Sequence, residues 1–224
     1  MKYLFKVFRK IILGEQREIK LAYELAEIIK NYSKKSHIKI LDYGSGFEPK
    51  IARLIKSELL NKQIKCDFHC LDLYGINDLE SLNGLENLNN SSNIEFFHIN
   101  HLVDSNEFYD FAIISDTLHH VGVENTEVIK KILLKIKNVT GILIIKDHFE
   151  YSIFSRWVLK FMDFIGNYYN NVNIPKKYFT KNSFDELLVE LNFNINEKIL
   201  DKRYYSKIFM YLSNPKLHFI YVIS

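Results

Sequence analysis

The residues best suited to chemistry stand together in one short stretch, Asp42-Tyr43-Gly44-Ser45-Gly46. The apolar residues just before it predict a buried strand, and Pro49 suits the first turn of a helix that follows. Glycines in the turn between them allow positive φ angles and a close approach of the backbone to a ligand. Such a strand–glycine turn–helix unit holds nucleotide-like ligands at the carboxyl end of a parallel strand.

The spacing of the glycines distinguishes between two kinds of ligand. The dinucleotide fingerprint needs a third glycine, whereas this turn continues as Phe47-Glu48-Pro49. Glu48 at the start of the helix would repel a diphosphate, while Asp42 ahead of the glycines suits a ligand with an amine. The alternative is an ordinary strand–turn–helix corner without a ligand.

The next predicted strand, residues 64–72 (IKCDFHCLD), ends in Asp72. Ligands gather at the carboxyl ends of strands in parallel sheets, so Asp72 is placed to accept hydrogen bonds from both hydroxyls of a ribose. The alternative is that Asp72 only ends the strand in a turn. Further strands are predicted over residues 94–100, 109–116, 141–147, 193–200 and 217–223, and helices alternate with the strands as far as residue 147.

Two phrases resemble motifs of the class I S-adenosylmethionine (SAM) dependent methyltransferases. Residues 40–49 (ILDYGSGFEP) resemble the first motif of the family, and residues 108–121 (FYDFAIISDTLHHV) are similar to its fourth-strand motif. The resemblance covers residues 37–224. It implies an α/β, Rossmann-like fold with a mostly parallel seven-stranded sheet, helices on both faces, an antiparallel last strand and a helical cap segment.

The resemblance also implies which residues bind SAM. The backbone of the glycine turn would meet the methionine end, Asp42 the amine, and Asp72 with the adjacent Leu73 the ribose. The family commonly carries an acid after the third strand, and this chain has Asn100 and His101 there instead, flanking the adenine. The predicted cofactor-binding residues are Asp42, Gly44, Ser45, Gly46, Asp72, Leu73, Asn100, His101, Asp116 and Thr117.

Three histidines lie at the ends of neighbouring predicted strands, where a methyl acceptor would sit: His119, His120 and His148. A hydroxyl acceptor must lose a proton, histidine titrates in a suitable range, and Asp147 could orient His148. His148 is the preferred base, and these four residues are the candidate catalytic groups. The alternatives are structural histidines and a helix-capping Asp147. The spacing of Asp147, His148 and His120 is not diagnostic of a metal, so no metal site is predicted.

Aromatic and apolar residues recur at helical spacing after the fifth strand, namely Phe154, Trp157, Val158, Phe161, Ile165 and Tyr168. They predict either core or dimer packing or a cap that walls the acceptor pocket. The predicted division is N-terminal helices over residues 1–36, a methyltransferase domain over 37–224 and a cap over 148–180. Ser183-x-x-Glu186 predicts a capping box that opens a further helix.

Composition excludes several classes of protein. The chain has 224 residues, a formal charge of +3 and no uninterrupted apolar run long enough for a membrane span. The small charge argues against a nucleic-acid partner. Cys66 and Cys70 are expected to be reduced core thiols, the alternative being a metal pair with His69. Residues 1–14 predict an amphipathic helix that packs on the domain, or else contacts a membrane surface weakly or a partner protein.

These observations predict a cytoplasmic, SAM-dependent methyltransferase that acts on a small molecule, most readily at oxygen. Homodimerisation is left open. One alternative is a SAM-binding or scaffolding protein without catalysis, which the Asn100 departure keeps open. The other is a nicotinamide-dependent oxidoreductase, which the missing third glycine and Glu48 disfavour.

Overall fold

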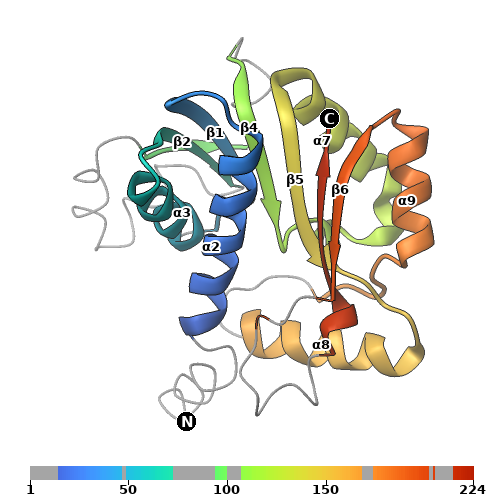
Figure 1. The fold of residues 1–224 in the computed structure, drawn as a ribbon. Helices are drawn as coiled ribbons and strands as arrows, with labels where there is room; N and C mark the ends of the chain where they lie inside the picture. Colours follow the sequence, from blue (N-terminus) through green and yellow to red (C-terminus); the bar gives the residue numbers. More distant parts are fainter. Residues whose placement is uncertain are drawn as a thin grey trace.

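A seven-stranded sheet forms the centre of the computed structural model, in the order β3-β2-β1-β4-β5-β7-β6 (Figure 1). The structure describes residues 15–46, 49–72, 94–99, 107–167, 174–201, 204 and 214–224. The strands from β3 to β5 run parallel, and β7 runs antiparallel to both of its neighbours, which confirms the predicted arrangement. The strands are β1 (His37–Tyr43), β2 (Lys65–Asp72), β3 (Ile94–His98), β4 (Tyr109–Ser115), β5 (Thr140–His148), β6 (Ile195–Leu200) and β7 (His218–Ile223).

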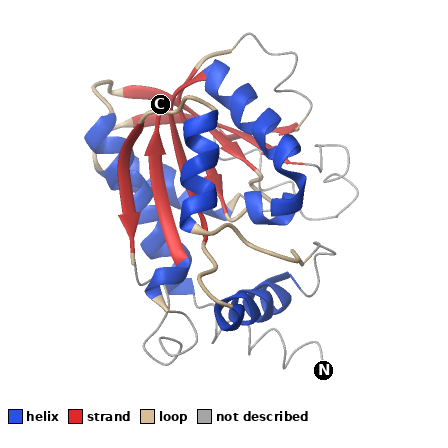
Figure 2. Cartoon of the chain, turned by 90° about the vertical axis from the view of Figure 1, so that its right-hand side faces the viewer, coloured by secondary structure: helices blue, strands red, loops and turns tan. Residues whose placement is uncertain are grey.

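Helices cover both faces of the sheet, and one helix crosses its lower end (Figures 1 and 2). The first face carries α2 (Glu15–Tyr32) and α3 (Lys50–Asn61), and the second carries α7 (Thr126–Val139) and α9 (Lys181–Glu190). Helix α8 (Ile153–Asn167) lies across the end of the sheet toward which β5 points. Three short helical turns complete the described elements: α6 (Leu118–Val121), η2 (Val123–Asn125) and η4 (Pro215–Leu217).

The central strands are apolar on both faces because both faces are covered. Along β1, Ile38 and Ile40 pack into the cluster that contains the inner residues of α2 and α3. Leu41 and Tyr43 point the other way, into the cluster that contains residues of α6, α7 and α9. This is why the sequence shows nearly continuous apolar runs in its strands, and why the strands could be predicted from it.

The apolar spacing over residues 124–137 predicts a helix whose inner face is made by Val128, Ile132, Leu133 and Ile136, and the structure corrects this face. The expected helix from Glu124 has its first residues in η2, and α7 itself begins at Thr126. Its buried face is made by Ile129, Leu133 and Ile136, whereas Val128 is 48% exposed. The prediction that Val128 points inward was therefore wrong, because the inner face follows the i, i+4, i+7 series from residue 129.

Helix α9 begins three residues earlier than predicted. Its N-cap is Thr180, whose hydroxyl accepts a hydrogen bond from the Ser183 backbone N–H at 3.1 Å. The Ser183 hydroxyl in turn accepts from the Thr180 backbone N–H at 3.0 Å, which completes a capping box. The predicted box of Ser183 and Glu186 was wrong because threonine one turn earlier is also a favoured N-cap residue. At the far end, Asn192 takes a φ of 54°, the left-handed conformation that asparagine can adopt after a helix.

Helix α8 turns its aromatic stripe outward. Phe154 and Trp157 are 74% and 68% exposed, and Phe161 is also exposed. The buried face instead carries Leu159 and Asp163, together with Ser155 and Ile165. The expectation of core packing was therefore wrong for the aromatic residues, and another face of the helix carries a buried acid, Asp163.

Other expectations concern the cysteines, the membrane and the N-terminus. Cys66 and Cys70 are both free and buried, as expected of core thiols. Burial raises the pKa of Cys66 to about 11, so its thiol is protonated at neutral pH. Within the described residues, no helix is both long and apolar enough to cross a membrane. The predicted helix over residues 1–14 and Tyr168 of the aromatic stripe lie outside those residues.

Candidate active site

The glycine turn joins the carboxyl ends of β1 and β2. Gly44 takes a φ of 79°, and its N–H donates to the Leu71 carbonyl at 2.7 Å. Gly46 takes a φ of 74°, and its N–H donates to Oδ2 of Asp72 at 2.8 Å. Both conformations favour glycine. The turn and Asp72, which were predicted to share one ligand, are thus held together by a hydrogen bond.

Thr117, which follows the end of β4, also contacts this turn. The Thr117 hydroxyl donates to the carbonyl of Ser115 at 3.0 Å and lies 3.4 Å from that of Gly44. A Cβ atom at Gly44 would lie only 2.4 Å from the Thr117 side chain. The Thr117 side chain therefore limits how closely the glycine turn can approach the end of β4 with any residue larger than glycine at position 44. At Gly46, in contrast, a Cβ atom would meet nothing within 4 Å.

Asp42 is buried at the end of β1, 4% exposed. Burial, together with the nearby negative charge of Asp72, raises its pKa to about 7. The carboxyl group is therefore half-protonated at neutral pH in the free protein, and a cation beside it would favour its ionised form. Leu73, Asn100 and His101, the other predicted cofactor contacts, lie outside the described residues.

Asp116 is the centre of a group of ion pairs, which we call the Asp116 cluster: Asp116, Arg17, Lys146 and His148. Its carboxylate pairs with Arg17 and with Lys146, and lies 3.1 Å from Nε2 of His148. Burial alone would raise the pKa of Asp116, but these neighbouring cations hold it well below its usual range. The Asp116 carboxylate, which was predicted to bind the cofactor, is thus already surrounded by positive charge from this chain.

A second polar group lies beside the first and is called the His119 centre: His119, His120, Asp147 and Asp163. Nδ1 of His119 lies 2.5 Å from Oδ1 of Asp147, and its Nε2 lies 3.6 Å from Oδ2 of Asp163. Burial would lower the pKa of His119, but the two carboxylates outweigh it and raise the pKa to about 10. In the absence of any bound ligand, His119 is therefore a protonated imidazolium at neutral pH that lies between two carboxylates.

The predicted catalytic residues come together in this region. The ring centroids of His119 and His120 are 4.0 Å apart, and those of His119 and His148 are 5.1 Å apart. Asp147 does not cap a long helix. Its carboxylate instead accepts hydrogen bonds from the backbone N–H groups of His119 at 3.3 Å and His148 at 2.8 Å. Burial and the charge of Lys146 lower the pKa of His148.

Several residues of this region were not singled out in the sequence. Asp163 comes from the buried face of α8, where the Tyr178 hydroxyl donates to it. Arg17 comes from α2, and Lys146 and His218 come from β5 and β7. Only Asp163 could have been noticed from the sequence, as the single acid within the strongly apolar α8. A buried carboxylate there needs a polar partner, which would have pointed to a contact with another segment. The others become visible only when distant segments meet.

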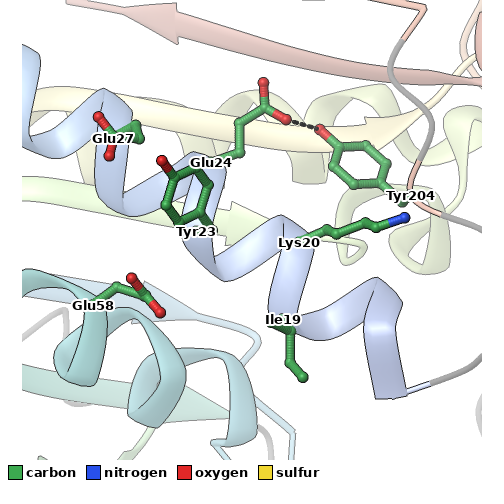
Figure 3. A pocket seen from close by; sticks show the side chains of 7 residues that line it. All are labelled: Ile19, Lys20, Tyr23, Glu24, Glu27, Glu58 and Tyr204. Carbon is green, nitrogen blue, oxygen red and sulfur yellow. Dashed lines mark hydrogen bonds between the residues drawn. The ribbon is translucent and has the colours of Figure 1, made fainter.

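A hollow with a volume of about 520 Å³ lies elsewhere, beside α2 (Figure 3). Glu24 and Glu27 of α2, Glu58 of α3 and two tyrosines line it, and the Tyr204 hydroxyl donates to Glu24 at 3.3 Å. It contains no predicted site residue. The candidate site therefore rests on the glycine turn and the polar groups and not on this hollow.

No protein-family model matches the chain, and no curated protein matches it. Solved structures do. The magnesium protoporphyrin IX methyltransferase of Synechocystis PCC 6803 with bound S-adenosylhomocysteine (SAH) is 14% identical, with a TM-score of 0.56 over 92% of this chain and 83% of that chain. The mitomycin 7-O-methyltransferase MmcR is 14% identical, with a TM-score of 0.60 over 92% of this chain and 53% of that chain.

A third solved structure matches over its whole length. The cyclopropane-fatty-acyl-phospholipid synthase-like protein of Lactobacillus casei ATCC 334 is 10% identical, with a TM-score of 0.58 over 100% of both chains. Against MmcR, in contrast, this chain spans about half the length. Identities this low bear on architecture alone. The structural matches and the strand order together show that this chain has the Rossmann-like fold of the class I SAM-dependent methyltransferases.

Proposed function

We propose that the protein is a SAM-dependent methyltransferase that acts on an oxygen of a small-molecule acceptor. The observation that carries the proposal is the hydrogen bond of 2.8 Å between the Gly46 N–H and the Asp72 carboxylate. It joins a glycine turn and a strand-ending acid at neighbouring carboxyl ends of a parallel sheet, where this fold class binds its ligands. The shared fold with solved SAM-dependent enzymes supports the same function.

The residues present suit SAM better than a dinucleotide. The space beside Gly46 is open, which leaves room for a ligand against the turn. Asp72 can accept hydrogen bonds from ribose hydroxyls, and Asp42 lies where it can pair with an amine through its ionised form. Bound SAM would supply a methyl group on a positively charged sulfur. The acceptor oxygen would attack that carbon while the carbon–sulfur bond breaks and its electron pair stays on sulfur.

The protein's own contribution to such a transfer is mainly alignment, which can lower a barrier by several kcal/mol. A hydroxyl acceptor must also release a proton. The polar side chains of His119, His120, Asp147 and His148 lie at the strand ends beside Thr117, and we propose that the acceptor oxygen faces them. His148 is already bound to Asp116, so the His119 centre has the stronger claim to contact the acceptor.

The test is calorimetric titration of the purified protein with SAM, SAH and NADH, followed by assays with methyl-labelled SAM and a panel of hydroxyl-bearing acceptors. We expect saturable binding of SAM and SAH and none of NADH. The Asp72→Ala variant should weaken SAM binding about 100-fold or more, since each hydrogen bond to a charged group is worth about 1.5–3 kcal/mol. Asp67→Ala, on the outer part of the same strand, is the matched control. A folded protein that binds neither SAM nor SAH would contradict the proposal.

A pH dependence follows from Asp42. Because its pKa in the free protein is raised to about 7, a cationic ligand beside it must compete with the bound proton. SAM affinity is expected to rise between about pH 5.5 and about pH 7.5, by up to tenfold per pH unit below the pKa. Titrations across this range should show the slope in the wild type and none in Asp42→Asn. An equal slope in both proteins would assign it to another group.

The same pKa fixes the sign of a stability effect in the absence of ligand. The folded state holds a proton on Asp42 up to about pH 7, whereas the unfolded chain releases it near its ordinary value of 3.8. The contribution of Asp42 to stability is therefore full below the lower value and is lost as the pH rises toward 7. Comparing wild type with Asp42→Asn isolates this contribution from those of other groups.

A further inference from the structure

The His119 centre holds two carboxylates on one imidazole. Asp147 lies on one side of the ring and Asp163 on the other, and all three side chains are buried. Asp147 has its hydrogen bonds satisfied by His119 and by the backbone of His148. Nε2 of His119, on the other side, is buried and has no hydrogen-bond partner among the described residues. This nitrogen faces Asp163 across a gap of 3.6 Å.

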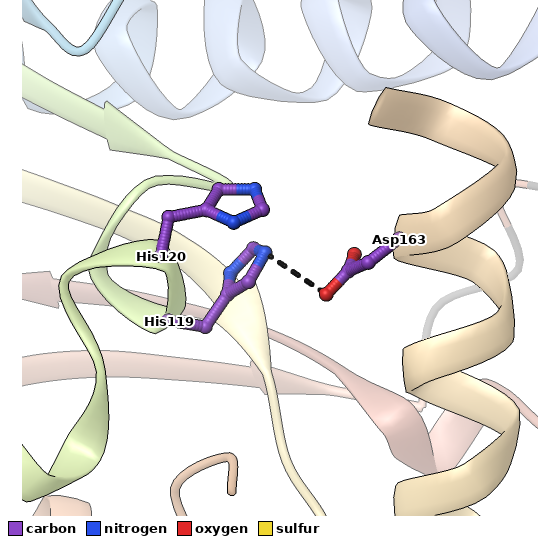
Figure 4. Close-up of side chains that lie close together, drawn as sticks. All are labelled: His119, His120 and Asp163. Atoms are coloured by element: carbon purple, nitrogen blue, oxygen red, sulfur yellow. Dashed lines mark ion pairs between the residues drawn. The ribbon is translucent and has the colours of Figure 1, made fainter. Parts of the chain in front are cut away.

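The gap has the dimensions of a metal site. Two ligand atoms bound at about 2.0–2.1 Å and at a tetrahedral angle lie roughly 3.3–3.5 Å apart. The second imidazole, that of His120, stacks beside His119, and single ligand atoms of His119, His120 and Asp163 lie within 4.8 Å of one another. Figure 4 shows both rings, on α6, turned toward the carboxylate of Asp163 on α8. His120 is half-buried, whereas His119 and Asp163 are buried, so the third ligand lies on the more accessible side of the group.

We propose that His119, His120 and Asp163 form a binding site for a divalent first-row transition-metal cation. Two imidazoles and one carboxylate suit zinc, iron(II) or cobalt(II) and not magnesium or calcium, which prefer oxygen ligands. Three protein ligands leave a position open, as in catalytic and not structural metal sites.

The surroundings of the site fit this assignment. Ligating histidines usually donate their other ring N–H to a carboxylate, which fixes the tautomer and raises the basicity of the ligand. Asp147 has this relation to His119, and the Tyr178 hydroxyl donates to Asp163 in the same way. Nδ1 of His119 would then donate to Asp147 while Nε2, which faces Asp163, would bind the cation.

The site lies next to the region assigned to the acceptor, because α6, which carries both histidines, begins directly after Thr117. A cation there would bind the acceptor hydroxyl, favour the release of its proton to solvent and hold the oxygen for attack on the methyl carbon. This role rests on the proposed function, whereas the metal site itself does not.

The test uses the untagged full chain after treatment with a chelator and dialysis. Calorimetric titration with ZnCl₂ should show one cation per chain, titration with CoCl₂ should give the visible absorption bands of low-coordinate cobalt, and MgCl₂ should give neither. His120→Ala and Asp163→Asn are expected to weaken zinc binding by more than about 100-fold. Tyr178→Phe, which removes only the outer hydrogen bond, should weaken it about 10-fold.

The exposed His37, which pairs with Asp67 at the far end of β1, supplies the control variant His37→Ala. It should bind zinc like the wild type, and circular dichroism should establish that each variant is folded. Absence of zinc binding by the folded wild type would overturn the proposal. So would binding that survives in folded His120→Ala and Asp163→Asn, because the cation would then have other ligands. None of these readouts needs SAM, so failure here is distinguishable from failure of the proposed function.

Discussion

Replacing Asp116 with asparagine is expected to lower the free energy of unfolding by about 3–5 kcal/mol, the range for removing one partner of a buried ion pair. Lys146 is fully buried and pairs with Asp116, and Arg17 and His148 contact the same carboxylate. Without the carboxylate, the ammonium group would stay buried beside other cations or lose its proton. Asp116 has a φ of 53°, a conformation that asparagine also tolerates, so backbone strain would not explain the loss.

Urea denaturation monitored by circular dichroism would measure this effect. The double variant Asp116→Asn with Lys146→Met removes both charges and fills much of the same volume, and it should recover most of the stability. Recovery would assign the loss to the unpaired ammonium of Lys146. A change of less than about 1 kcal/mol in Asp116→Asn would contradict the account and give the ion pair the value of an exposed one.

The fold could be predicted from the sequence because its main signals are local. The run from Tyr109 to Ser115 is apolar on both faces, and such a run reports a strand covered on both sides wherever it lies in the chain. The glycine turn is also local, since Gly44 and Gly46 take the positive φ angles that only their own residue type favours. The antiparallel direction of the last strand was predicted from the family resemblance, because periodicity shows only that a strand is present, and the order of the strands comes from the structure.

Helix α8 shows that local sequence patterns do not determine which face of a helix is buried. Its sequence has an aromatic stripe and, on another face, Ser155, Leu159 and Asp163, so periodicity identifies faces without saying which one is buried. Burial of Asp163 depends on His119, which lies 44 residues earlier and reaches it only through the folded sheet. The aromatic stripe was predicted to form core or dimer packing or else a cap over the acceptor pocket, because large aromatic side chains usually pack against another surface.

The Asp116 cluster and the His119 centre could be predicted only in part, because some of their residues are indicated by local sequence and others are not. Asp147 and His148 end β5, and His119 and His120 lie in α6 shortly after the end of β4, so the sequence indicates this edge of the sheet for all four. Their partners come from elsewhere: the ion pair between Arg17 and Asp116 joins residues 99 positions apart. Ion pairs between residues so far apart produce no recognisable spacing in the sequence. The partners of each histidine, and the direction of its pKa shift, therefore follow only from the structure.

Replacing Gly44 with alanine is expected to remove SAM binding and to destabilise the protein by about 2–5 kcal/mol. A side chain at a φ of 79° costs about 1–2 kcal/mol, and the new Cβ atom would lie 2.4 Å from the side chain of Thr117. Overpacking of this kind costs typically about 1–3 kcal/mol more. Relief of the contact would move the turn away from β4 and separate its N–H groups from Leu71 and Asp72.

Gly46→Ala provides the matched control, because its φ of 74° imposes similar strain while the added Cβ atom meets nothing within 4 Å. It should lose only about 1–2 kcal/mol. Urea denaturation and calorimetric titration with SAM would be measured for both variants. Adding Thr117→Gly to Gly44→Ala should restore part of the stability, because it removes the atoms that the new Cβ meets. Equal effects of the two alanine substitutions would mean that strain alone acts, and that contact with Thr117 does not set the position of the turn.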